Sequence, residues 1–206
     1  MKSTSILYLG SSSLSRQLLL RQASIPFTVL KQSADETQCD WNLPLPDVVT
    51  TIARYKMEHC LMPGGTDGER CFVLTADTLS VDSRGHIQGK PTDKADAIAK
   101  LRAIRDGYVM TGTAFCLERK IYRGGSWITE DSVLEFVKAE YIFNVPEAWI
   151  ETYLQSFEGQ LGTASINIEE SGNLFLKEIK GSYSTVVGLP LYELRQALEK
   201  IGFYSM

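Results

Sequence analysis

A serine-rich segment, GSSSLSR at residues 10–16, is the first stretch whose residue types could do chemistry. It joins the apolar run 6–9, which predicts a buried strand, to a helical pattern that contains three leucines at 18–20. The first N–H groups of a helix are unpaired and carry a partial positive charge, so they attract anions. Serine hydroxyls add donors, and Arg16 adds a guanidinium that can bind two phosphate oxygens. The segment predicts an anion site; a serine cap beside a solvent-exposed arginine is the alternative.

Lys56 is the second candidate. It shares a helical stripe with Val49, Ile52, Ala53 and Cys60, so its side chain is expected to point where apolar side chains point. A lysine at such a position either extends its ammonium group back to solvent or enters a cleft and meets an anion. The local pattern leaves both interpretations open.

Two carboxylates and one more lysine complete the set of candidates. Asp77 ends the apolar run 71–77, and ligands of open α/β sheets bind at the carboxyl ends of strands, where a carboxylate can hold Mg²⁺ or accept a proton from water. Glu36 lies in a polar loop, and Lys90 follows a glycine at the end of a hairpin. A turn-capping aspartate, a solvated glutamate and an exposed turn lysine are the alternatives. Together, these cations and carboxylates predict Mg²⁺-assisted phosphoryl or nucleotidyl transfer.

The composition is typical of a globular protein. The 206 residues are 44% hydrophobic and 22% charged, with a net charge of −4 and four cysteines. The acidic balance argues against broad binding to nucleic acid or membrane surfaces. The cysteines form no CxxC pair, which favours free thiols in a reducing cytoplasm, and no apolar run approaches the length of a membrane span. We therefore expect a cytoplasmic protein with no membrane partner.

Helices and strands alternate in the first half of the chain and give way to long strands in the second. The expected strands are 6–9, 27–31, 71–77, two around a Gly-Gly turn at 124–125, and 175–180, with a hairpin turning at 82–85. The expected helices follow the serine-rich segment, span 46–61, begin after Asp93, and span 145–157 and 191–201. This order predicts an α/β protein with a mixed sheet and two lobes around a cleft.

Seven short motifs recur in order along nearly the whole chain. They are SSSLSR at 11–16, DET at 35–37, IARYKM at 52–57, TADT at 75–78, GKP at 89–91, TGTA at 111–114 and GSYSTVVGLP at 181–190. Their order and spacing resemble those of the Maf family of nucleoside triphosphate pyrophosphatases. The resemblance implies a single Maf-like domain over residues 1–206, with an elongated mixed sheet, flanking helices and the two-lobed fold of the inosine triphosphate pyrophosphatases. Because many members of the family form homodimers, the resemblance also implies a possible homodimer.

The resemblance implies hydrolysis of a nucleoside triphosphate to the monophosphate and pyrophosphate, with Mg²⁺ or Mn²⁺ as cofactor. Asp77 matches the aspartate that acts as general base on water. Lys56 and Lys90 match phosphate-binding lysines, and Glu36 matches an acidic residue near the metal and the phosphates. The expected metal ligands are therefore Asp77 and Glu36.

The serine-rich segment matches the family's phosphate-binding loop but departs from its pattern. Ser11, Ser13 and Arg16 match, whereas Leu14 and Ser15 replace a proline and the first of two arginines. One cation is therefore lost from the loop, and we count Ser15 among the substrate-binding residues.

Other departures bear on the choice of base. Aligned without gaps from Gly181, Glu169 stands where many members have glutamine, which exchanges a donor and acceptor for an acceptor alone. A subgroup that acts on methylated guanine nucleotides has an acidic residue here, whereas Tyr183 is similar to the pyrimidine-preferring subgroup. Two further replacements, of the usual glycine by Thr75 and of the usual alanine by Met57, fit a change in packing alone and not in base preference.

Two other functions remain open at this level. The lost arginine fits a nucleotide-binding regulator of cell division with weakened turnover. A hydrolase of the inosine triphosphate pyrophosphatase family is the third possibility, and the GSYSTVVGLP motif at 181–190 argues against it.

Overall fold

The computed structural model describes residues 6–105, 107–157 and 161–204. Its strands are β1 (Ile6–Leu9), β2 (Thr28–Val29), β3 (Arg70–Val81), β4 (Ile87–Gln88), β5 (Val109–Arg123), β6 (Ser126–Phe143) and β7 (Leu176–Lys180). Its α-helices are α1 (Leu14–Gln22), α2 (Leu45–Glu58), α3 (Lys94–Ala103), α4 (Ile150–Ser156), α5 (Tyr183–Val187) and α6 (Leu191–Lys200). Short 3₁₀ turns occupy Glu36–Gln38, Glu147–Trp149, Thr163–Ser165 and Glu170–Phe175. None of the described helices is both long and apolar enough to cross a bilayer.

The strands form a mixed sheet in the order β2-β1-β3-β5-β6-β7, with β4 paired to β3. β1 runs parallel to both β2 and β3, whereas β4 pairs antiparallel with β3 and β7 with β6. Gly124 and Gly125 form the expected turn between β5 and β6, and both have positive φ, which glycine adopts without a steric penalty. The mixed α/β class predicted from the sequence is confirmed.

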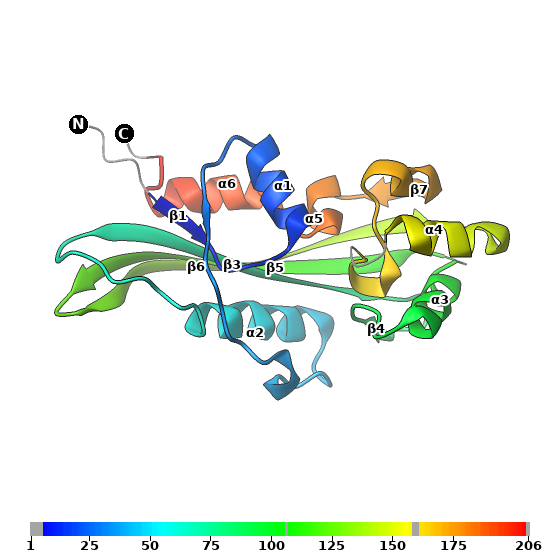
Figure 1. Cartoon of the computed structure of the whole chain (residues 1–206), viewed down its shortest axis with the longest axis horizontal. Coiled ribbons are helices and arrows are strands. Elements are labelled where there is room, and N and C mark those ends of the chain that lie inside the picture. Colours follow the sequence, from blue (N-terminus) through cyan, green and yellow to red (C-terminus); the bar gives the residue numbers. More distant parts are fainter. Residues whose placement is uncertain (1–5, 106, 158–160, 205–206) are drawn as a thin grey trace. The chain divides into compact units, whose positions relative to one another are not determined.

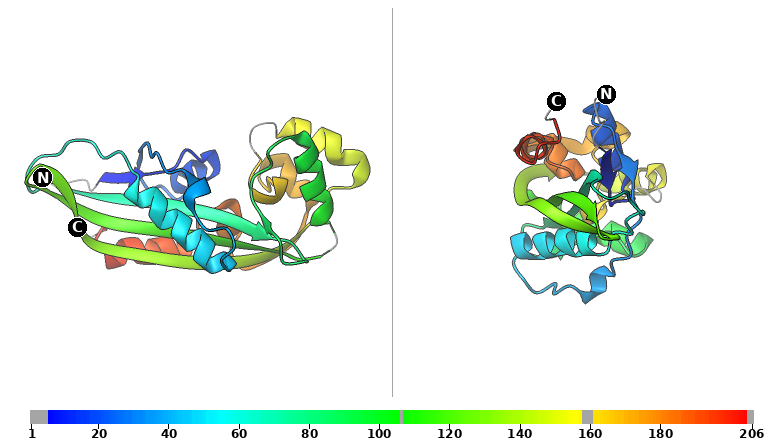
Figure 2. Two further views of the ribbon diagram at one scale, coloured as in Figure 1. Left: turned by 90° about the horizontal axis from the view of Figure 1, so that it is seen from below. Right: turned by 90° about the vertical axis from the view of Figure 1, so that its left-hand side faces the viewer.

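The described residues divide into two compact units. Unit 1 lies within Met1–Asp77, Ala114–Phe136 and Gly188–Met206, and unit 2 within Thr78–Thr113 and Val137–Val187. In unit 1, α2 lies on one face of the strands, while α1 and α6 lie on the other (Figures 1 and 2). One cluster of its core joins the sheet to the α2 side: Leu30, Met57, Cys71, Val73 and Cys116.

Unit 2 has its own apolar core, which α3 and α4 cover together with the turn at Thr163–Ser165. The largest side chains in this core are aromatic: Tyr141, Phe143, Tyr153 and Phe157. Their rings meet edge-on or tilted, with centroids 5.1–5.8 Å apart for the contacts of Tyr153 with Phe143 and Phe157. Each unit therefore has a hydrophobic core of its own.

Four details differ from the sequence predictions. The strand expected at 71–77 continues to Val81, because Ser80 and Val81 pair with Gln88 and Ile87 of β4. The expectation that Asp77 lies at the end of a strand is therefore wrong. The helix expected over 46–61 ends at Glu58, the strand expected over 27–31 is confined to Thr28–Val29, and α5 was not predicted. All four cysteines are free thiols, as expected.

Candidate functional site

Helix α2 carries Lys56 into the interior of unit 1. The helix begins after Pro44 with Asp47 in its first turn, and its apolar stripe packs against the strands. Lys56 lies in the last turn on this same stripe, and only 9% of its side chain is exposed. The interpretation that this lysine extends back to solvent is wrong, because its ammonium group has partners inside the protein.

The partners of Lys56 are two carboxylates. Its Nζ donates to Oδ1 of Asp77 at 2.7 Å and lies 2.8 Å from Oε1 of Glu36. The side chain of Asp77 is 8% exposed, whereas that of Glu36 is 41% exposed and faces solvent in part. The ammonium group lies between the two carboxylates and offsets the cost of burying the charge of Asp77. We refer to Glu36, Lys56 and Asp77 as the Lys56 centre.

The second carboxylate oxygen of Asp77 has unusual surroundings in the described part of the chain. Oδ2 of Asp77 is buried and accepts no hydrogen bond from any described residue. A buried carboxylate oxygen without a donor is unusual in a folded protein and points to a group that binds there. The oxygen is thus available to a water molecule or a metal ion.

Glu36 is positioned by its own short turn. Asp35 caps this turn by accepting a hydrogen bond from the N–H of Thr37 at 3.1 Å. The indole N–H of Trp41 then donates to the carbonyl of Glu36 at 3.1 Å. The loop expected from the sequence is therefore locally ordered, and it brings the partly exposed Glu36 to Lys56.

The serine-rich segment is built around Arg16. Ser13 caps α1 by accepting from the N–H of Arg16 at 3.4 Å, so the serine-cap interpretation holds for this residue. The arginine is not solvent-exposed: it is buried, its Nε donates to the carbonyl of Gly188 at 2.8 Å and its Nη1 to Oγ of Ser11 at 3.2 Å. Ser15 is half-buried in the first turn of α1.

Electrostatics link Arg16 to the Lys56 centre. Burial lowers the pKa of the Arg16 guanidinium, while the negative charges of Asp77 and Glu36 act in the opposite direction. A guanidinium remains protonated at any physiological pH, so it supplies a second fixed positive charge near the two carboxylates. Arg16, Glu36, Lys56 and Asp77 therefore share one region of unit 1.

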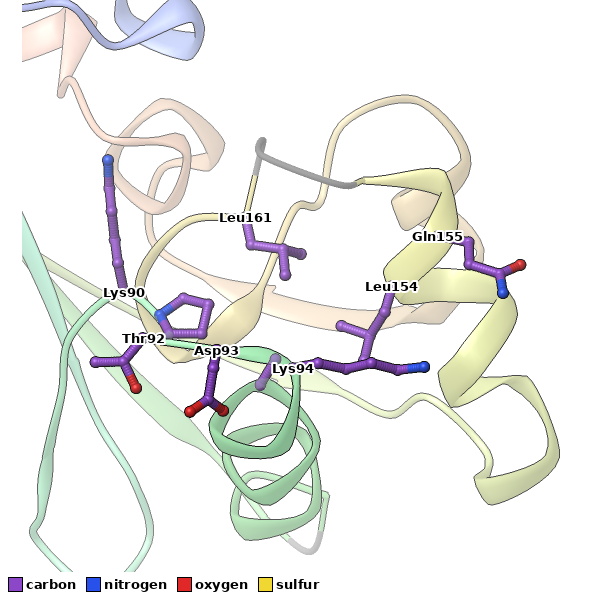
Figure 3. A pocket seen from close by; sticks show the side chains of 9 residues that line it. Lys90, Thr92, Asp93, Lys94, Leu154, Gln155 and Leu161 are labelled. Atoms are coloured by element: carbon purple, nitrogen blue, oxygen red, sulfur yellow. The ribbon is translucent and has the colours of Figure 1, made fainter.

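Lys90 belongs to unit 2 and has different surroundings. It follows β4, is exposed, and forms no ion pair with any described residue. It lines a pocket of about 500 Å³ beside the start of α3, with Pro91, Leu154 and Leu161 among the other lining residues. Figure 3 shows its side chain extending away from α3. The described structure thus leaves its ammonium group accessible.

Glu169 also lies in unit 2, close to Tyr183. Its N–H donates to Oδ1 of Asn167 at 2.8 Å, which holds the backbone just before the turn at Glu170–Phe175. Burial raises the pKa of the Tyr183 phenol, and the charge of Glu169 adds to this shift. The charge of Glu169 therefore acts on Tyr183, the other residue that the sequence connected with base preference.

Comparison with known proteins decides the family. The family model described as Maf-like protein matches residues 6–201. The chain belongs to the Maf family. The resemblance predicted from the seven motifs is thereby confirmed, and the match extends through both units.

Curated relatives of this Maf protein have closely similar lengths. A dTTP/UTP pyrophosphatase of Pseudoalteromonas translucida is 35% identical, over 95% of this chain and 97% of the relative. A dTTP/UTP pyrophosphatase of Halalkalibacterium halodurans is 34% identical, over 96% of each chain. A nucleoside triphosphate pyrophosphatase of Chlamydia pneumoniae is 30% identical, over 95% of this chain and 94% of the relative.

Two features of the site in this Maf protein were missed by sequence reasoning. The carbonyl of Gly188, in the GSYSTVVGLP motif, binds Arg16, and only the fold brings residues so distant in sequence together. Cys39 lies near the Lys56 centre: burial raises the pKa of its thiol, Glu36 and Asp77 raise it further, and Lys56 opposes them. Its position three residues after Glu36 was the only available signal.

Proposed function

We propose that this Maf protein hydrolyses a nucleoside triphosphate between the α and β phosphates, releasing the monophosphate and pyrophosphate. The observation that carries the proposal is the Lys56 centre. A buried lysine is held between two carboxylates, and the buried Oδ2 of Asp77 has no donor among the described residues. The family match and the names of the relatives support the same reaction.

The carboxylates of the Lys56 centre fit a divalent metal ion such as Mg²⁺ or Mn²⁺. Both are hard oxygen ligands, and Oδ2 of Asp77 is free of hydrogen bonds from the described residues. The described residues contain no cluster of three or more metal-ligating side chains, and Mg²⁺ commonly uses one or two carboxylates together with substrate phosphates. Asp77 and Glu36 would hold the ion, which would neutralise phosphate charge when bound.

The side chains would act in sequence on the bound triphosphate. Lys56 and Arg16 offset the negative charge of the phosphates, and Asp77 orients a water molecule and accepts its proton. The water oxygen forms a bond to the α phosphorus as the bond from that phosphorus to the bridging oxygen breaks. Pyrophosphate leaves with the bonding electrons, and the proton passes from Asp77 to solvent.

Other residues keep the roles that the resemblance implies. Lys90 is proposed as a further phosphate ligand, Ser11, Ser13 and Ser15 as hydroxyl donors to the substrate, and Glu169 as a contact to the base. We also propose that residues 1–206 form one domain with the two-lobed fold of the inosine triphosphate pyrophosphatases, in a cytoplasmic protein that can form a homodimer.

For the base we propose thymine or uracil. Relatives at 35% and 34% identity are named dTTP/UTP pyrophosphatases, and Tyr183 belongs to the motif that resembles the pyrimidine-preferring subgroup. Glu169 is the departure that could redirect this choice, so a methylated guanine nucleotide is the informative comparison. Replacement of Glu169 by Gln tests whether its carboxylate contributes to the selection.

The decisive experiment measures pyrophosphate release by purified protein with Mg²⁺ or Mn²⁺, using dTTP, UTP, the other canonical triphosphates and methylated GTP. We expect release from dTTP and UTP, and a loss of about 10²–10⁴-fold in Asp77→Asn. Near-normal turnover in a folded Asp77→Asn variant would remove Asp77 from the role of base. Nucleotide binding without release from the unmodified protein would instead favour the regulator hypothesis.

A further inference from the structure

Thr75 is a fully buried residue of β3 whose side chain contacts two other elements of unit 1. Its Oγ1 donates to the backbone carbonyl of Ala53 on α2 at 2.7 Å. Its methyl carbon faces Gly10, where an added Cβ would lie only 2.8 Å away. One side chain therefore connects β3 to α2 and packs against the start of the serine-rich segment.

The hydrogen bond of Thr75 and the ion pair of Asp77 with Lys56 join the same two elements, β3 and α2. Side chains two apart in a strand share a face, so Thr75 and Asp77 point to the same side of β3. Residues three apart in a helix are neighbours on its surface, so Ala53 and Lys56 face the same strand. Strand β3 and α2 are thus joined twice, by Thr75 to Ala53 and by Asp77 to Lys56.

The two connections are expected to respond differently when a substrate binds. The ammonium group of Lys56 and Oδ2 of Asp77 are the groups proposed to meet the substrate and the metal ion, so this ion pair can rearrange when they bind. The bond between Thr75 and Ala53 uses a backbone carbonyl and a buried hydroxyl, and neither belongs to the groups proposed above to bind the substrate. It can therefore keep the distance from α2 to β3 constant while the ion pair rearranges.

We infer that Thr75 is a positioning residue for the pyrophosphatase reaction. Its hydroxyl holds α2 against β3 so that Lys56 and Asp77 act on the substrate from fixed positions, and its methyl group sets the position of Gly10 before the serine-rich segment. This inference rests on the proposed function. It assigns a role to a side chain that would touch neither substrate nor metal.

The test compares variants that separate the hydroxyl from the methyl group. Thr75→Val keeps the shape and the methyl contact but removes the donor, whereas Thr75→Ser keeps the donor. We expect kcat for dTTP to fall about tenfold in Thr75→Val with KM within about threefold, because misplacing catalytic groups costs rate more than binding. We expect Thr75→Ser to stay within about threefold of the unmodified protein in kcat.

Thr111→Val is the matched control. Thr111 is a fully buried strand threonine of unit 2, and its Oγ1 lies 2.7 Å from Oγ of Ser80, so this variant also loses a buried hydroxyl bond. We expect its thermal midpoint to fall about as much as that of Thr75→Val, with kcat within about twofold of the unmodified protein. Equal losses of kcat in the two valine variants would overturn the inference.

Further measurements test the role of Thr75 independently of a folding defect and of the proposed reaction. If Thr75→Val does not fold, Thr75→Ser and Thr75→Ala ask the same question, since they differ only in the hydroxyl. Equal kcat in those two variants, or normal kcat in Thr75→Val, would overturn the inference while leaving the reaction intact. Absence of pyrophosphate release by the unmodified protein would instead count against the proposed function.

Discussion

Lys56 in unit 1 and Lys90 in unit 2 are predicted to do the same task, yet the structure gives them opposite surroundings. Lys56 is buried and lies within 2.8 Å of two carboxylate groups. Lys90 is exposed and forms no ion pair with the described residues. Opposite charges and packing position the side chain of Lys56, whereas the side chain of Lys90 is positioned by the backbone that carries it.

The backbone before Lys90 is held by the turn at Thr163–Ser165. Oγ1 of Thr163 donates to the carbonyl of Gln88 and accepts from the N–H of Ser80 at 3.1 Å. The N–H of Ala164 donates to the carbonyl of Gly89 at 3.1 Å. The position of the buried ammonium group is therefore determined by the charges of its partners, whereas the position of the exposed one is determined by the hydrogen bonds of its main chain.

Lys56→Met should have the largest effect. It leaves Asp77 buried without its cation, so we expect the free energy of unfolding to fall by about 3 kcal/mol and turnover by about 10²–10³-fold. Urea denaturation and pyrophosphate release measure the two effects. The exposed Lys31 provides the control, because Lys31→Met should change stability by less than about 0.5 kcal/mol. Equal stabilities of the two variants would show that the Lys56 centre is not electrostatically coupled.

Gly10→Ala and Gly89→Ala test the backbone in the two regions. A Cβ at Gly10 would lie 2.7 Å from Sγ of Cys60 and 2.8 Å from the methyl carbon of Thr75, whereas a Cβ at Gly89 would meet no atom within 4 Å. We expect Gly10→Ala to lose about 1–3 kcal/mol of stability and at least about tenfold in activity. Gly89→Ala should remain within about twofold in activity. Similar behaviour of both would mean that β1 can move away from Thr75.

Lys90→Ala should affect binding without affecting stability. An exposed lysine with no ion pair contributes little to folding, so we expect an unchanged thermal midpoint and a KM for dTTP raised about tenfold. Because salt screens exposed charges, the KM of the unmodified protein should rise more steeply with NaCl than that of the variant. Parallel salt dependences would show that Lys90 does not meet the phosphates.

Thr163→Val should have the smallest effect. It removes the hydroxyl that connects Gln88 to Ser80, so the segment before Lys90 loses one of its anchors. We expect kcat/KM to fall about threefold, and to fall no further when the substitution is combined with Lys90→Ala, because residues that act together are not additive. An additive loss in the double variant would assign Thr163 a role independent of Lys90.

Much of the fold followed from local patterns. The apolar stripe of α2, the glycine turn between β5 and β6, and the cap of α3 by Asp93 are properties of short segments, and the structure contains all three. The end of β3 differs from the prediction, because the strand continues beyond Asp77 and its last residues, Ser80 and Val81, pair with β4. A strand's length depends on partners that its own residues do not reveal.

The candidate site, like the fold, was predictable in its local features but not in its tertiary contacts. The sequence by itself determined which charged residues were candidates and, through seven ordered motifs, which family they belonged to. Only the tertiary structure decided that Lys56 is buried between Glu36 and Asp77, that Arg16 binds the carbonyl of Gly188, and that Thr75 joins β3 to α2. The physical reason is that motifs are local in the chain, whereas burial, ion pairing and desolvation depend on segments that meet only when the chain folds.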